Sequence, residues 1–274
     1  MRELLSAGLH RFRKSAVFWV TLAITLVLGL IAGAVTESSA SLQIIYFVGL
    51  FLVIVIQISL MIGIEFGNGV VRNKLIAGHG KSAVFFSELI LSLISATLLF
   101  VVFYGAFALF NANAQWLKHV NARVMATVIV VLWLLHLTLA AICTAICFFI
   151  PYYAAVAAVL NVVLVLVMTF VCDDLHLRFN EPEFFYTRYY DENGELGPEI
   201  AEPNPKSIPR DSTEYALLHT AYYIMPFGQL IDCATAVYSD QLPDDLKTAP
   251  QYSVIAMGAF TVAGVISFRK KNLK

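Results

Sequence analysis

EFGNGVVRNKLIAGHGKSAVFFSE, residues 65–88, is a polar and basic stretch between two long apolar runs. It is too polar to span a bilayer and too short to form a core of its own. Glycines at positions 67, 69, 78 and 80 interrupt it, and Arg72, Lys74 and Lys81 make it basic. A charged segment of this kind, held at a membrane face, is a natural contact for a soluble partner, so we expect one here.

The composition is that of an integral membrane protein. The chain has 274 residues, of which 59% are hydrophobic and 14% charged, and its mean hydropathy is +0.76. Soluble domains carry about 25% charged residues. No run of Lys or Arg suggests a nucleic-acid partner. The first apolar run is too long for a cleavable signal peptide and lacks a convincing cleavage site, so we expect it to remain as a helix.

Six apolar runs are long enough, or nearly long enough, to cross a bilayer, which takes roughly 20 residues. They are residues 15–35, 42–64, 87–110, 124–150, 152–172 and 252–268. Backbone polar groups in lipid must bond within their own segment, so these runs are predicted to be helices. The expected fold class is therefore an all-α integral membrane protein with six transmembrane helices, the first five within residues 15–172.

Basic residues set the expected orientation. Residues 1–14, 65–86 and 269–274 hold 11 of the 18 Lys and Arg, and six spans place these segments on one side. The connections 36–41 and 111–123, on the other side, hold only Lys118 and Arg123. The positive-inside rule then predicts that both termini are cytoplasmic. Pro151 and its neighbours would form a tight cytoplasmic turn between the fourth and fifth spans.

The N-terminal segment MRELLSAGLHRFRK, residues 1–14, has helical apolar spacing. Leu4, Leu5, Leu9 and Phe12 share one face, which predicts an amphipathic helix in the cytoplasmic membrane interface. A disordered basic tail is the alternative. At the other end, residues 252–274 are expected to form the sixth span and a basic cytoplasmic tail.

The external segment, residues 173–251, is strongly acidic, with fifteen Asp and Glu against five Lys and Arg. Its first part, 173–211, is rich in Pro, Glu, Asn and Tyr, and the stretch DENGELGPEIAEPNPKSIP at 191–209 within it is expected to be turns and loop. Its second part, 212–239, opens with a cap-like serine and then becomes apolar. It predicts two short helices, broken at Pro226, that lie on or dip into the outer membrane face.

Most motifs of catalysis or ion transport are missing from the sequence. Gly80-Lys81-Ser82 resembles the end of a phosphate-binding loop, but Leu75 stands where that loop needs glycine, so we expect no nucleotide site in this chain. The spans hold almost no charged residues, which disfavours ion-driven transport. The histidines lack metal-ligand spacing, so we expect neither a metal nor an enzyme.

Two cysteines, Cys172 and Cys233, fall on the predicted outer side, where disulfides persist. A bridge between them is one interpretation, and two free thiols are the other. Cys143 and Cys147 lie four residues apart in the fourth span and are expected to serve only in packing.

Taken along the whole chain, these features resemble the ABC-2 type permeases, the membrane subunits of ATP-binding-cassette exporters. The residues that carry the resemblance are the basic helix 1–14, the stretch EFGNGVVRNKL at 65–75, Gly78, Lys81 and Ser87 with their spacing, MPF at 225–227 and the ending FRKKNLK at 268–274. Similar members include exporters of phenol-soluble modulins and lantibiotic or bacteriocin immunity permeases of bacterial cell membranes.

The resemblance implies two permease copies, each served by a separate ATPase subunit that carries the ATP and Mg²⁺. It makes 65–86 the segment that couples to the ATPase. The residues implied in this contact are Glu65, Arg72, Asn73, Lys74, Leu75 and Lys81. An ordinary solvated loop is the alternative for this segment.

The substrate class follows less directly. The acidic, aromatic outer segment would suit cationic amphipathic peptides, because an acidic surface concentrates cations. Export of drugs or lipids is an alternative, and so is a sensory or anchor subunit without transport. Acidic charge also simply keeps an exposed loop soluble.

Overall fold

The computed structural model describes residues 2–35, 40–111, 121–150, 154–188 and 199–271. Within these ranges six helices are long and apolar enough to cross a membrane, which confirms the all-α six-span prediction. They are α2 (Ala16–Val35), α3 (Ala40–Gly67), α5 (Lys81–Asn111), α7 (Ala122–Phe149), α8 (Ala154–Asn180) and α11 (Asp244–Lys270). The turn predicted at Pro151 lies outside the described residues.

The six helices form a bundle around α7, which packs on α11, α5 and α3. Its buried side chains include Leu135, Leu139 and Phe148. Small residues allow close approach elsewhere in the bundle. A Cβ at Gly29 of α2 would lie 2.5 Å from the Phe103 carbonyl oxygen of α5, and one at Gly264 of α11 would lie 2.6 Å from the Phe85 ring.

The outward faces of the bundle are apolar, as lipid requires. Val159 and Phe170 of α8 are 61% and 73% exposed, and Val101 of α5 is 59% exposed. Apolar side chains this exposed, on helices this long, indicate contact with lipid or with another membrane helix.

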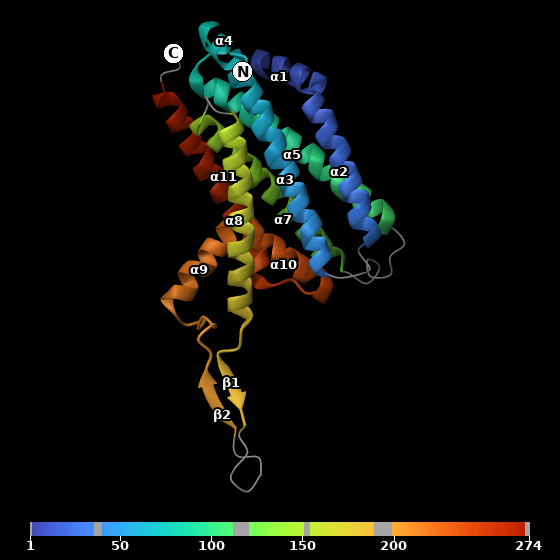
Figure 1. The fold of residues 1–274 in the computed structure, drawn as a ribbon, viewed down its shortest axis with the longest axis vertical. Helices are drawn as coiled ribbons and strands as arrows, with labels where there is room; N and C mark the ends of the chain where they lie inside the picture. The colour runs from blue at the N-terminus through green and yellow to red at the C-terminus, as the bar shows by residue number, and fades with distance from the viewer. Residues whose placement is uncertain (1, 36–39, 112–120, 151–153, 189–198, 272–274) are drawn as a thin grey trace.

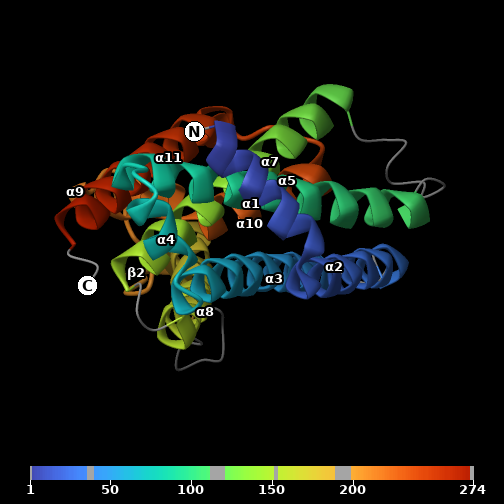
Figure 2. The ribbon, with the colours of Figure 1, turned by 90° about the horizontal axis from the view of Figure 1, so that it is seen from above.

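The two ends of the bundle differ (Figure 1). One end carries the short helices α1 (Arg2–Lys14) and α4 (Val70–Ile76) and both chain termini, and we call it the α4 end. Seen from above, α1 lies across this end of the bundle (Figure 2). The opposite, hairpin end carries α9 (Thr213–Ile224), α10 (Pro226–Ser239) and a two-stranded ribbon.

The structure corrects two predictions for this part of the chain: the fifth span does not end at residue 172, and the stretch 191–209, expected to be turns and loop, contains a strand. Helix α8 continues to Asn180, and strands β1 (Phe184–Thr187) and β2 (Ile200–Pro203) then pair antiparallel. A 27-residue helix is about 40 Å long, whereas the hydrocarbon core is about 30 Å thick. The last turns of α8 therefore project beyond the membrane and support the ribbon.

The other part of the outer segment is helical on both sides of Pro226. Ser212 caps α9, because its side chain accepts a hydrogen bond from the Tyr215 N–H at 3.0 Å. Pro226 opens α10 at a position where its missing N–H costs nothing. Helix α11 begins at Asp244, eight residues before the span predicted from hydropathy.

We expect the two ends of the bundle to lie on opposite sides of the membrane. Single cysteines at Glu199, beside the ribbon, and at the exposed Lys270 should therefore differ in labelling by an impermeant maleimide on intact cells. The background has the four native cysteines replaced, and labelling of permeabilised cells is the control. Equal labelling of both sites on intact cells contradicts this topology.

Candidate functional site

Helix α4 is a seven-residue helix between α3 and α5, bounded by glycines. Gly69 precedes it at φ 68° and Gly78 follows it at φ 88°, in the left-handed region that favours glycine. The helix turns one face inward, where Val71 and Lys74 are buried. These glycines therefore let a short, tightly bounded helix fold back against the ends of the spans.

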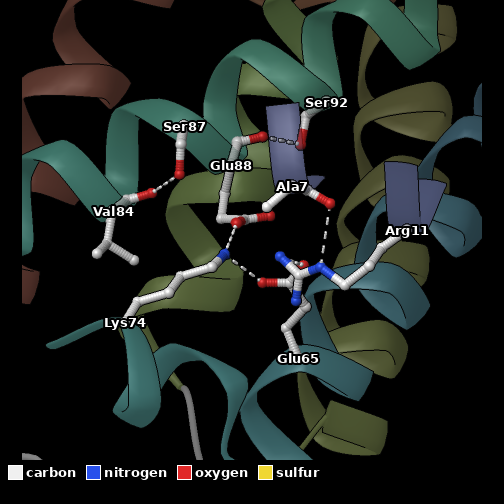
Figure 3. A network of polar contacts seen from close by, with 8 residues as sticks. All are labelled: Ala7, Arg11, Glu65, Lys74, Val84, Ser87, Glu88 and Ser92. Carbon is white, nitrogen blue, oxygen red and sulfur yellow. Dashed lines mark hydrogen bonds and ion pairs between the residues drawn. The ribbon is translucent and has the colours of Figure 1, made fainter. Parts of the chain in front are cut away.

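Lys74 is the centre of a buried ion cluster (Figure 3). Its Nζ lies 2.7 Å from Glu65 Oε2 in the last turn of α3, and it also pairs with Glu88 Oε1 in the second turn of α5. Arg11 Nη2 of α1 lies 3.0 Å from Glu65 Oε1. The side chains of Lys74, Glu65 and Glu88 are 8%, 14% and 5% exposed.

The charges in this cluster balance: two carboxylates meet one ammonium and one guanidinium. Desolvation makes a buried ion pair a weak source of net stability, but removal of one partner leaves an uncompensated buried charge. The cluster therefore constrains geometry. It holds α1, α3, α4 and α5 in one arrangement.

The six residues predicted for ATPase coupling do not lie together in the structure. Glu65 and Lys74 meet in the ion cluster, whereas Arg72 and Asn73 point outward and are exposed. Leu75 is half-buried against the core. Lys81 lies elsewhere, where its Nζ donates to the Arg269 carbonyl at 3.0 Å and to the Lys271 carbonyl at the end of α11.

Sequence reasoning missed Arg11 and Glu88 as members of this site. The signal for Glu88 was available, since a carboxylate inside an apolar run needs a partner. It does not say which partner, because Lys74 lies 14 residues away in sequence. Arg11 was one of several basic residues in the N-terminal helix, and only the fold brings it to Glu65.

The outward face of α4 is both apolar and basic. Ile76 is 73% exposed and lies beside the exposed Arg72 and Asn73. A groove of about 370 Å³ runs between α4 and α1, with Asn73 on one wall and Glu3 on the other. This face, defined by Arg72, Asn73 and Ile76 and called the α4 face below, offers an apolar anchor point with a charged rim.

A second polar cluster lies at the hairpin end, around Asp232 of α10. Its carboxylate accepts from the Tyr222 hydroxyl at 3.2 Å and from the Tyr223 hydroxyl, and His176 Nδ1 of α8 lies 3.8 Å away. Burial raises the pKa of Asp232 above its ordinary 3.8, although the tyrosine hydrogen bonds oppose the shift. Burial, followed by the Asp232 charge, also raises the pKa of both tyrosines.

Cys172 and Cys233 are buried free thiols in this structure, so the bridge considered from the sequence is not formed. Cys172 Sγ instead lies 3.9 Å from Met225 Sδ. Over the part of the chain that the structure describes, no group of three or more His, Cys, Asp or Glu side chains gathers that could hold a metal ion.

Comparison with known proteins gives no family. No protein-family model matches the chain, and no curated protein is significantly similar to it.

Loss of Lys74 should destabilise the fold. We expect Lys74→Met to lower the free energy of unfolding by about 3–5 kcal/mol, because two carboxylates lose their buried cation. Arg72→Met, on the exposed side of the same helix, should change it by less than about 0.5 kcal/mol. Thermal unfolding in detergent measures both. A Lys74→Met protein as stable as the Arg72→Met protein contradicts the role of the cluster.

The Asp232 cluster should make stability depend on pH. Because the folded pKa of Asp232 is raised, its contribution is full below the unfolded value of 3.8 and is lost as pH rises through the folded pKa. The thermal midpoint should therefore show a component that falls as pH rises from about 4. Asp232→Asn should remove that component, and Asp211→Asn, at an exposed site, should keep it. Identical pH profiles for wild type and Asp232→Asn contradict the assignment.

Proposed function

We propose that this chain is the permease subunit of an ATP-driven exporter of the ABC-2 type, and that a separate ATPase docks on the α4 face. The six apolar helices fit a membrane transporter-like protein. The observation that carries the proposal is the two-sided character of α4. Its outward side presents Ile76 and Arg72, while its inward side is fixed to two spans through Lys74.

The polar side chains in the bundle interior favour transport driven by ATP hydrolysis on a partner over transport driven by ions. Ser95 donates to Gln57 at 2.8 Å, and Asn161 donates to Ser59 at 2.8 Å. His136 bonds a carbonyl of its own helix. These polar side chains form hydrogen bonds within or between neighbouring helices, as is common in membrane bundles. The contacts do not form a chain of titratable groups across the bundle, which ion-driven transport would use.

The ion cluster supplies a route by which a docked ATPase would act on the spans. A partner that moves α4 also moves Lys74, whose Nζ is bonded to α3 and α5. Glu65 carries the same displacement to α1 through Arg11. Nucleotide binding and hydrolysis on the partner would in this way shift three membrane-associated elements together.

The substrate that we propose is a cationic amphipathic peptide, and the transporter is a dimer of two copies of this chain. The acidic, aromatic hairpin end supports this substrate class, since Phe184, Phe185 and Tyr186 of β1 are 44%, 44% and 67% exposed. Aromatic side chains on an acidic surface suit a ligand that carries both apolar area and positive charge.

Substitution of the α4 face tests the docking. Removal of a buried interface anchor costs about 2 kcal/mol or more, so Ile76→Asp should abolish co-purification of the ATPase with tagged permease from its native membrane. Arg72→Ala should weaken it more gently and in a salt-dependent way, as expected for a charge at an interface rim.

Leu217→Asp is the matched control, because Leu217 of α9 is 71% exposed at the opposite end. It should retain the bound ATPase. The proposal fails if tagged wild-type permease carries no ATPase, or if Ile76→Asp retains as much ATPase as Leu217→Asp.

A further inference from the structure

A cavity of about 310 Å³ lies beneath α1, between α1, α3 and α5. This volume is at the lower end of the range for small-molecule sites. Glu65 and Glu88 line one wall, and Arg11 and the exposed Lys14 line its side toward α1. The cavity is therefore lined by carboxylates on α3 and α5 and by cations on α1.

The carboxylates keep capacity for another donor. Lys74 approaches Glu65 and Glu88 from α4 and lines the separate groove between α4 and α1, not this cavity. A carboxylate offers about four acceptor sites on its two oxygens. Lys74 occupies one site on each carboxylate and Arg11 occupies one on Glu65, so acceptor sites remain and a second ammonium group on the cavity side can share these two carboxylates.

Beyond the charged wall the cavity becomes apolar and then polar again. Ile58, Met61 and Leu91 line it, followed by Ser92 and Ser95 one turn apart on α5. Ser95 donates to Gln57 Oε1 at 2.8 Å, and Gln57 is fully buried. Within the described residues Gln57 Nε2 has no partner, so a buried N–H donor next to the cavity lining lacks an acceptor.

The position of the cavity places it at the level of a membrane surface. Helix α1 is amphipathic and lies across the α4 end of the bundle (Figure 2). Its inward face, Leu4, Gly8 and Phe12, is buried, while Leu9 remains 40% exposed beside the basic residues. A helix with this distribution lies in the head-group region of a bilayer, so the cavity beneath it is within reach of lipid head groups.

We propose that this cavity binds the head group of a phosphatidylethanolamine-type lipid from the leaflet at the α4 end. The phosphate pairs with Arg11 and Lys14, and the primary ammonium donates to Glu65 and Glu88. The first acyl carbons contact Met61 and Leu91.

The mixture of charges selects this head group over others. A head group with only negative charge would place its anion beside two buried carboxylates. A choline head group carries the positive charge but no N–H, so it forms no charge-assisted hydrogen bond with Glu65 and Glu88. Only a zwitterion with a primary ammonium satisfies both sides of the cavity.

Native mass spectrometry of the full chain in detergent tests the proposal. The protein is titrated with phosphatidylethanolamine, phosphatidylcholine and phosphatidylglycerol that have identical acyl chains. Each charge-assisted hydrogen bond lost lowers affinity about tenfold or more, so phosphatidylethanolamine should be retained about tenfold better than the other two.

Two variants with matched charge locate the binding. Lys14→Gln should lower retention of phosphatidylethanolamine, because the phosphate loses a cation that lines the cavity, whereas Arg13→Gln removes the same charge from α1 outside the cavity and should keep it. Ser92→Leu, which fills the cavity and loses only a bond to a carbonyl of its own helix, should lower retention with an unchanged thermal midpoint.

Equal retention of the three lipids overturns the proposal, as does tighter binding of phosphatidylglycerol, which would mean attraction to the basic helix alone. Unaltered retention in Ser92→Leu shows that any bound lipid lies elsewhere and overturns it as well. The experiment needs no ATPase, so its outcome is independent of docking on the α4 face.

Discussion

The ammonium group of Lys74 is buried at the end of a membrane bundle, and that charge must be neutralised where it lies. A carboxylate from the last turn of α3 and another from the second turn of α5 meet at this nitrogen. Arg11 pairs with the α3 carboxylate, Glu65, and ties α1 to the same point. The position of α4, the spacing of two spans and the roof over the cavity beneath α1 all depend on this one neutral cluster.

Within the bundle, lipid removes the hydrophobic force that drives helices together in water, so packing and polar pairs take its place. Gly29 and Gly264 let α2 and α11 approach α5 closely, and the Gln57–Ser95 and Asn161–Ser59 pairs join neighbouring helices. The interior is therefore close-packed and nearly without charge. Within the described residues, the Asp, Glu, Lys and Arg side chains of the spans lie toward the helix ends.

The two ends of the bundle use charge in different ways. At the α4 end two cations and two carboxylates compensate each other, and the other side of α4, with Arg72, Asn73 and Ile76, is exposed. At the hairpin end Asp232 is held by two tyrosine hydroxyls and by His176, so its charge is supported mainly by neutral donors. One end thus ties four elements together through ion pairs, whereas the other holds a buried carboxylate mainly through hydroxyl donors.

The sequence alone determined six helical spans, because a long apolar run in lipid can satisfy its backbone only as a helix. It also placed a helix break at Pro226, where a missing N–H acts locally. It did not predict the β1–β2 ribbon, whose strands are separated by a polar stretch. It also did not determine that Ile76, and not Leu75, is the apolar residue on the outward side of the two-turn helix α4. The membership of the Lys74 cluster was equally hidden, since Arg11, Glu65 and Glu88 lie up to 77 positions apart in the chain. Those contacts exist only once the spans have packed, because the energy of a buried charge depends on what surrounds it in space and not on its neighbours in sequence.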